Sequence, residues 1–128
     1  MIPSKKVVFT TNAPAPIGPY SQAVIANNML FVSGQIALNP QTNSIINEDI
    51  YQETKQVMLN VGAVLEAAGV SFQNIVKTSI FLKDMGNFAA VNEIYGHFFT
   101  DNFPARETVE VSRLPKDVNV EISVIAVI

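Results

Sequence analysis

The sequence has 128 residues, a size typical of one domain spanning residues 1–128, and 15% of the residues are charged, giving a net charge of −3. No block of like charges forms the basic stripe that a phosphate backbone requires, so nucleic acid is not an expected partner. The chain has no cysteine and one histidine, which excludes disulfides, thiolate nucleophiles and the usual zinc sites. No carboxylate loop has the spacing of an all-oxygen metal site, so we expect no metal.

Hydrophobic residues make up 48% of the sequence, which is high for a small domain, yet no apolar run approaches the roughly 18 residues needed to span a bilayer. The start, MIPSKKVVF, lacks the apolar core of a secretory signal and the Arg-rich pattern of a transit peptide. We therefore expect a cytoplasmic protein without membrane association. Part of its apolar surface should be covered by another protein surface, such as copies of itself.

The first third of the chain predicts strands around an irregular loop. KKVVFT, residues 5–10, is typical of a strand, whereas TNAPAPIGPY, residues 11–20, contains three prolines and a glycine that prevent regular structure. In residues 21–36, SQAVIANNMLFVSGQI, two apolar runs flank Asn27-Asn28. Because asparagine tolerates positive φ, this pattern predicts a hairpin that ends near Ser33-Gly34.

Two helices follow, separated by a strand. Apolar residues in 48–68 recur on one helical stripe, with Gly69 placed to cap the C-terminus and Gly62 indicating close packing. Residues 74–82, NIVKTSIFL, are typical of a strand, and Asn87 is a candidate cap for a second helix. The stripe of that helix consists of Phe88, Val91, Ile94, Tyr95 and Phe98.

The last segment, FPARETVEVSRLPKDVNVEI with SVIAVI after it, is interpreted as a hairpin with a tight turn near Lys116-Asp117. The complete order of elements predicts an α+β fold in which two helices cover one face of a sheet of four to six strands. In the hairpin register, Val111 would pair with Ile122, and Val109 with Val124, beneath the helices. The opposite face would carry Arg106, Thr108, Glu110, Ser112, Glu121, Ser123, Ile125 and Val127.

That opposite face is too polar for a core and too apolar for open water, so we expect it to be buried against another subunit of a closed cyclic homo-oligomer. In this register Arg106 and Glu121 lie roughly 20 Å apart along one hairpin. They could therefore share a small ligand only if they came from different subunits. An ordinary role as ion-pair partners at a surface or interface remains open for both residues.

Arg106 and Glu121 nevertheless suit one chemistry. The planar guanidinium of arginine binds a carboxylate through two parallel charge-assisted hydrogen bonds. A glutamate in an apolar strand tends to a raised pKa and can take a proton from an attacking water. The pair fits a small carboxylate-bearing electrophile that is attacked by water.

Four further residues are candidates for ligand contacts. Ser33 and Gly34 offer a hydroxyl and a backbone N–H, although a strand-ending turn is the simpler explanation for them. Tyr20 follows a stiff proline-rich segment but could be an ordinary packed tyrosine, and Asn92 on the second helix could face a site or water. No Ser-His-Asp order, GxGxxG motif or Walker loop is present.

Several motifs occur together and in order from about Thr11 to the C-terminus: APIGPYSQA, FVSGQI, EAAG, VKTSIFLKDM, VNEIY and FPARETVEVSRLPKDVNVEI. Together they resemble the reactive intermediate deaminase family of RidA type, also called YjgF-like or liver perchloric-acid-soluble proteins. The resemblance implies a chorismate-mutase-like α+β fold and a homotrimer whose sheets face inward, with ligand clefts between subunits.

The resemblance also implies an activity. Members of this family hydrolyse reactive enamines and imines, such as 2-aminoacrylate and 2-iminobutanoate released by PLP-dependent dehydratases, to 2-keto acids and ammonia without a cofactor. Carried over by motif, Arg106 would bind the substrate carboxylate and Glu121 would position or deprotonate the attacking water. The substrate-binding residues would be Tyr20, Ser33, Gly34, Asn92 and Thr108.

One position departs from the pattern, because Glu107 stands where relatives usually have serine or alanine. Strand alternation points Glu107 away from Arg106, towards the helix side or the end of the strand. A bulge that turned it into the cleft would neutralise Arg106 and repel a carboxylate.

Two other functions stay open. One is a non-catalytic trimer that binds 2-keto acids or a partner in the same cleft. The other is RNA cleavage or translational inhibition, also attributed to the wider family, which the acidic balance disfavours.

Overall fold

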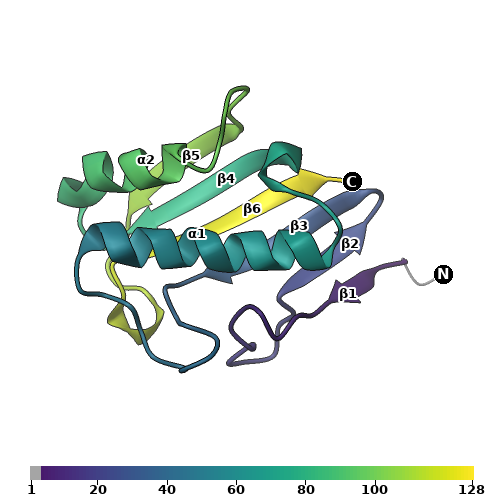
Figure 1. The fold of residues 1–128 in the computed structure, drawn as a ribbon, viewed down its shortest axis with the longest axis horizontal. Helices are drawn as coiled ribbons and strands as arrows, with labels where there is room; N and C mark the ends of the chain where they lie inside the picture. The colour runs from purple at the N-terminus through teal and green to yellow at the C-terminus, as the bar shows by residue number, and fades with distance from the viewer. Residues whose placement is uncertain (1–3) are drawn as a thin grey trace.

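The computed structural model describes residues 4–128 as one mixed sheet with two α-helices. The elements are β1 (Lys6–Val8), β2 (Ala23–Ala26), β3 (Met29–Gln35), α1 (Ile50–Ala67), β4 (Ile75–Leu82), α2 (Phe88–Gly96), β5 (Ala105–Glu110) and β6 (Val120–Val127). Both helices lie on the same face of the sheet (Figure 1). The predicted α+β architecture is confirmed.

The six strands are ordered β1-β2-β3-β6-β4-β5, and all neighbours are antiparallel except β4 and β5. The parallel pair is joined through α2, which makes a β-α-β unit. β2 and β3 form the predicted hairpin, with Asn27 at φ 50° and Asn28 at φ 61°. The predicted hairpin of the last two strands is wrong, because β4 lies between β5 and β6.

This strand order moves part of β5 to the other face from the one expected. Arg106 aligns with Thr78, and Thr108 with Ile80, whose side chains are buried under the helices. Arg106, Thr108 and Glu110 therefore lie on the helix side, which corrects the expected face. Val109, expected beneath the helices, aligns with Phe81 on the open face and is 40% exposed.

The two remaining residues of the expected β5 pattern are also placed differently. Ser112 lies beyond the end of β5. Val111 packs against a small separate cluster with Leu114 and Val118 instead of the main core.

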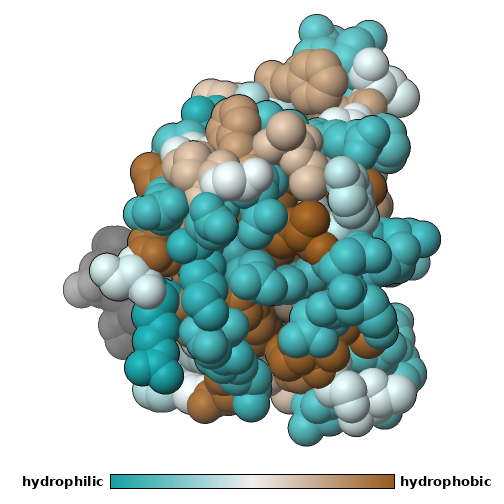
Figure 2. Space-filling view, turned by 90° about the vertical axis from the view of Figure 1, so that its left-hand side faces the viewer, coloured by the Kyte–Doolittle hydropathy of each residue, from teal (hydrophilic) through white to brown (hydrophobic). Residues whose placement is uncertain are grey.

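The rest of the open face matches the expectation. Glu121 aligns with Phe81, Ser123 with Ser79, and Ile125 with both Lys77 and Phe31, so polar and apolar side chains alternate across the sheet. Phe31 is 44% exposed. Figure 2 shows an adjoining side of the molecule, the one at the left in Figure 1, where hydrophobic residues are visible in patches between hydrophilic ones.

α1 has clear start and stop signals. The Asp49 carboxylate accepts a hydrogen bond from the Gln52 amide (2.8 Å) at the N-terminus. At the C-terminus Gly69 has φ 80°, the Gly69 amide donates to Glu66, and the Val70 amide donates to Leu65, which is a Schellman motif. The predicted helix over 48–68 is thus confirmed within two residues at its start and one at its end.

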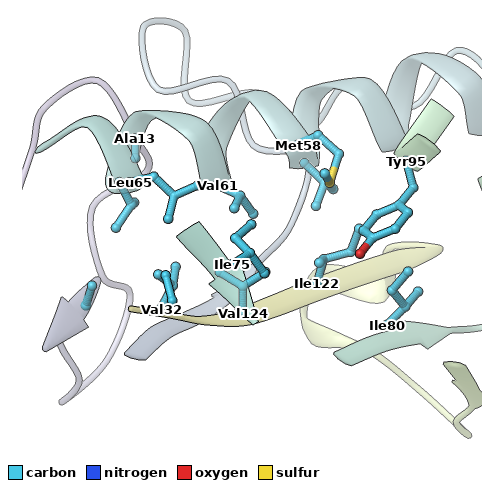
Figure 3. Close-up of a cluster of buried hydrophobic side chains, with 14 of the residues drawn as sticks. Ala13, Val32, Met58, Val61, Leu65, Ile75, Ile80, Tyr95, Ile122 and Val124 are labelled. Atoms are coloured by element: carbon cyan, nitrogen blue, oxygen red, sulfur yellow. The ribbon is translucent and has the colours of Figure 1, made fainter. Parts of the chain in front are cut away.

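The core lies between the helices and the sheet. Figure 3 shows Met58, Val61 and Leu65 of α1 above Ile122 and Val124 of β6. Gly62 lets Phe72 approach the helix, since an added Cβ would come within 3.0 Å of the Phe72 ring. The close packing expected at this glycine is confirmed.

Buried polar side chains tie α1 to two loops beside this core. Asn60 donates to the carbonyls of Ile36 and Leu38, both at 2.9 Å. The Glu53 carboxylate, 1% exposed, accepts hydrogen bonds from the backbone and side-chain amides of Asn119. Among the described residues, no helix is both long and apolar enough to cross a bilayer.

Candidate active site

Glu121 lies in a cavity of about 300 Å³ at the end of β3 and β6, called here the carboxylate pocket. Its walls are formed by Ile17, Tyr20, Ser33, Gly34, Ile36, Pro115 and Glu121. The structure thus brings together four of the predicted site residues, Tyr20, Ser33, Gly34 and Glu121. Within residues 4–128 the Glu121 carboxylate makes no hydrogen bond or ion pair, so it is free to act on a ligand or a water.

Gly34 and Glu121 are in close contact. β3 has an irregularity between Val32 and Gln35, which sets the Gly34 backbone against the Glu121 side chain. A Cβ at Gly34 would come within 2.8 Å of Cδ and 2.9 Å of Oε1 of Glu121, so only glycine leaves the carboxylate in place. Burial raises the pKa of the Glu121 carboxyl above its usual range, which makes the carboxylate a stronger base near neutral pH.

The other two predicted residues of this pocket are already hydrogen-bonded to the chain. The Ser33 hydroxyl donates its proton to the Ser21 carbonyl (2.6 Å), so towards a ligand it can act only as an acceptor. The Tyr20 hydroxyl accepts a hydrogen bond from the Ile17 amide (3.2 Å), which leaves its proton available to a ligand. Tyr20 is 47% exposed and is not an ordinary packed tyrosine.

Arg106 lies in a second cavity of about 320 Å³ between α2 and β5, called here the arginine pocket. It is lined by Asn92, Tyr95, Gly96, Phe103, Pro104 and Arg106. The Arg106 guanidinium carbon is 5.1 Å from the centre of the Tyr95 ring and 5.8 Å from that of Phe88. Stacking on two aromatic rings orients the guanidinium without neutralising it, and it forms no salt bridge within the described chain.

Tyr95 is itself fixed beneath Arg106. Its hydroxyl donates to the Thr78 hydroxyl (2.9 Å) on β4. Burial raises the pKa of the Tyr95 phenol, although the Thr78 hydrogen bond and the positive charge of Arg106 act in the opposite direction. Thr108 follows Arg106 on the same face of β5; its hydroxyl is buried without a partner, and it lines neither pocket.

The two pockets cannot serve one small ligand within a single chain. Arg106 aligns with Thr78 on β4 and Glu121 with Phe81, three residues further along, so the two side chains leave opposite faces of the sheet. They are also about 10 Å apart along the strands and about 10 Å apart across them. As expected, Arg106 and Glu121 of one chain cannot contact one small ligand. The cause is their location on opposite faces of the sheet, and not a separation of roughly 20 Å along one hairpin.

Glu107 is directed away from Arg106, as strand alternation predicted, but it lies on the open face and not on the helix side. Its carboxylate accepts a hydrogen bond from the Ser79 hydroxyl and forms an ion pair with Lys77 (2.9 Å). These contacts, with the one from Ser79 contributing most, lower the pKa of Glu107. In this arrangement its charge does not enter the arginine pocket.

Sequence reasoning missed several wall residues. Tyr95 was interpreted only as part of an apolar helical stripe, and its position one turn from Asn92 was the available signal. Phe103 and Pro115 belong to the motif FPARETVEVSRLPKDVNVEI, but nothing local indicates that they face a cavity. Ile36 lines the carboxylate pocket, and its carbonyl accepts a hydrogen bond from Asn60, a long-range contact that no local pattern indicates.

Comparison with known proteins places the chain among proteins with this fold. A family model described as Endoribonuclease L-PSP matches residues 10–128, so the chain belongs to this family. A RutC family protein of Pyrococcus horikoshii is 54% identical over 122 residues, covering 95% of this chain and 97% of the relative. The human 2-iminobutanoate/2-iminopropanoate deaminase is 42% identical over 123 residues, covering 96% of this chain and 90% of the relative.

A solved structure gives the same result. A conserved Rid family protein of unknown function from Yersinia pestis superimposes with a TM-score of 0.95 at 50% identity, covering 98% of this chain and all (100%) of the other. The predicted resemblance to the RidA-type family is therefore confirmed.

Proposed function

We propose that this protein hydrolyses 2-imino acids, and the 2-enamines from which they form, to 2-keto acids and ammonia. The observation that supports this most is a pair of opposite charges without partners among residues 4–128, Arg106 and Glu121, each in its own open pocket on opposite faces of one sheet. Two copies could join these pockets into one site. The named activity of the human relative is consistent with this chemistry.

Arg106 would bind the substrate carboxylate. Its guanidinium is held on Tyr95 and Phe88 and has no competing carboxylate within the described chain, so its donors are available to a ligand. A bidentate contact fixes both position and plane of a 2-imino acid, whose C=N bond is conjugated with the carboxylate. Asn92 would add a polar contact from α2, whereas Thr108, whose hydroxyl is buried on the same face of β5 as Arg106 and which lines neither pocket, would contact a ligand only after a local rearrangement.

Glu121 from a second copy would activate the water. The carboxylate takes a proton from the water as the water oxygen bonds to C2 of the substrate, the C=N bond becomes single, and the protonated Glu121 passes this proton to the nitrogen. In the resulting carbinolamine, Glu121 takes the hydroxyl proton and returns it to the amine nitrogen as the C–N bond breaks, so that ammonia leaves and the carboxylate is regenerated. The sum is imino acid plus water giving keto acid plus ammonia, with no redox change. An enamine such as 2-aminoacrylate enters the sequence after protonation at C3.

The same proposal includes the assembly. We propose a homotrimer in which the open sheet faces point inward and each arginine pocket meets the carboxylate pocket of the next copy. The open face supports this, because Phe31, Val109 and Val127 are each at least 38% exposed among polar neighbours. Exposed apolar surface of this kind is typical of a contact with another protein surface.

Subunit mixing tests the shared site. Arg106→Ala and Glu121→Ala homo-oligomers should each be inactive in a dehydratase assay in which semicarbazide traps the free imine. After the two are dissociated and reassembled together at equal amounts, about a quarter of the sites should combine an intact Arg106 with an intact Glu121 and recover activity. The double variant mixed with either single variant is the control and should recover none.

The outcomes separate the proposals. Absence of recovery with proven subunit exchange would show that both residues act from one chain or that neither acts. Saturable binding of a 2-keto acid by a wild-type protein that does not reduce trapping would instead show a non-catalytic binder. RNA cleavage is not favoured, since the net charge is −3 and phosphate backbones require clustered positive charge.

A further inference from the structure

Gln22, at the entrance to β2, is 2% exposed and lies outside both pockets. Its side chain makes four hydrogen bonds, all to the loop of residues 10–20. The side-chain oxygen accepts from the Thr10 amide (2.7 Å), and the side-chain nitrogen donates to the carbonyls of Thr10 (3.0 Å), Ala13 (3.3 Å) and Pro14 (2.8 Å). One buried side-chain amide therefore satisfies one backbone donor and three backbone acceptors of this loop.

The loop depends on such a contact because it has little internal bonding. Its three prolines lack an N–H group, and no strand or helix is formed between Val8 and Ala23. Within residues 10–20 one backbone–backbone hydrogen bond forms, from the Tyr20 amide to the Gly18 carbonyl (2.8 Å). Ala13, 3% exposed, is the part buried beneath Gln22.

The same residue also connects the loop to the strand that carries the site. The backbone carbonyl of Gln22 accepts from the Ser33 amide (2.9 Å), while the neighbouring Ser21 carbonyl accepts from the Ser33 hydroxyl. Gln22 thus joins the end of β3 through its main chain and the loop through its side chain. The loop in turn supplies Ile17 and Tyr20, one wall of the carboxylate pocket.

We infer that Gln22 is a positioning residue, which holds the 10–20 loop in place so that Ile17 and Tyr20 enclose Glu121. The inference rests on the proposed function for its catalytic consequence, but the enclosure itself is a property of the fold. When the four hydrogen bonds are lost, the loop moves away from the pocket and water reaches the carboxylate. The sheet and helices remain formed, because Gln22 bonds to no residue of α1 or α2 through its side chain.

The test compares Gln22→Met with Val61→Ala. Methionine has a similar length and no hydrogen-bonding amide, whereas Val61 is a fully buried residue of α1 that lines neither pocket, so its truncation removes core packing but none of the hydrogen bonds that hold the loop. At a temperature where both variants are folded, we expect Gln22→Met to lower kcat/KM about 10-fold or more and Val61→Ala to leave it within about 2-fold.

A double-variant cycle shows whether Gln22 acts through Tyr20. Adding Gln22→Met to Tyr20→Ala should change kcat/KM by less than about 2-fold, because the wall residue is already removed. Independent, multiplicative losses would overturn the inference and assign Gln22 a general structural role.

Two readouts do not require activity, so they separate this inference from the proposed function. By NMR, the Glu121 carboxyl should titrate at lower pH in Gln22→Met than in wild type, because hydration removes the cause of its raised pKa, while Val61→Ala should titrate as wild type does. In the wild-type protein the Thr10 amide, bonded to Gln22, should exchange with solvent at least about 100-fold more slowly than the amide of exposed Gly18. An unchanged Glu121 titration, or rapid exchange at Thr10, would overturn the inference even if the variants do not fold.

Discussion

The arginine pocket and the carboxylate pocket are built in different ways. Arg106 is supported by regular elements, since it belongs to β5 and rests on two aromatic rings of α2. Glu121 also belongs to a strand, but Ile17, Tyr20 and Pro115 around it come from segments between the strands. These segments are held by hydrogen bonds with the buried side chains of Gln22 and Glu53. The arginine pocket is therefore supported by secondary structure, whereas the carboxylate pocket depends on long-range polar contacts.

The largest effect is expected at Arg106. Arg106→Ala removes two charge-assisted hydrogen bonds to the substrate carboxylate, so kcat/KM for 2-iminobutanoate should fall about 1,000-fold. Arg106→Lys keeps the charge but not the fork, and it should retain an intermediate rate. The loss of the free imine, measured with semicarbazide, reports both values; an unchanged rate in purified Arg106→Ala would remove this role.

Glu121→Gln should have the next largest effect, and on a different constant. The amide cannot take a proton from water, so kcat should fall about 100-fold while KM changes little. Steady-state kinetics over a range of imine concentrations distinguish this from a binding defect. A rise in KM with normal kcat would mean that Glu121 binds substrate without acting as a base.

Gly34→Ala perturbs the carboxylate pocket alone. The new methyl group would lie 2.8 Å from Cδ of Glu121, so the carboxylate must shift and kcat should fall about 10-fold. Gly18→Ala is the matched control, since a methyl group there meets the Tyr20 ring at 3.7 Å, an ordinary contact. Equal rates for the two variants would show that the position of Glu121 is not critical.

The raised pKa of Glu121 predicts opposite pH trends for activity and stability. Activity should fall as the pH drops through this raised value, because the base becomes protonated. Between the ordinary glutamate pKa and the raised one, the folded chain binds more protons than the unfolded chain, so stability falls as the pH rises. Glu121→Gln should therefore be more stable than wild type near pH 7 in urea unfolding, and the difference should vanish below about pH 4.

The smallest effect is expected at Glu107. Its carboxylate is engaged with Ser79 and Lys77 on the open face and does not reach the arginine pocket. Glu107→Ala should keep kcat/KM within about 2-fold of wild type, measured on assembled protein of equal oligomeric state. An increase of 10-fold or more would mean that this charge does repel the substrate.

Local signals in the sequence gave most of the elements correctly. The apolar stripe of α1 and its glycine stop, the asparagine pair between β2 and β3, and the prolines before Tyr20 all act through neighbouring residues. The family motifs then identified Arg106 and Glu121, although their roles remain proposals. Asn87 does precede α2, but its side chain makes no capping hydrogen bond.

The order of the last strands was not predictable in the same way. Residues 111–119 do not close a tight turn; they cross the end of β4, with Lys116 and Asp117 both at φ 55°. β5 pairs with β4, which is distant in the sequence, so no local pattern indicates this pairing. The face on which each β5 side chain lies depends on which strand is its neighbour. For that reason Arg106 and Thr108 were placed on the wrong side, and the aromatic support from Tyr95 was missed.

Because the two pockets lie on opposite faces of the sheet, the number of complete sites in the proposed oligomer depends on whether its ring of subunits is closed. In a closed ring, every arginine pocket finds a neighbour's carboxylate pocket, whereas an open pair of copies joined by one such contact leaves one of each unmatched. Dilution that dissociates the oligomer into single chains would therefore abolish activity while every chain stays folded. The specific activity would then measure the fraction of assembled protein.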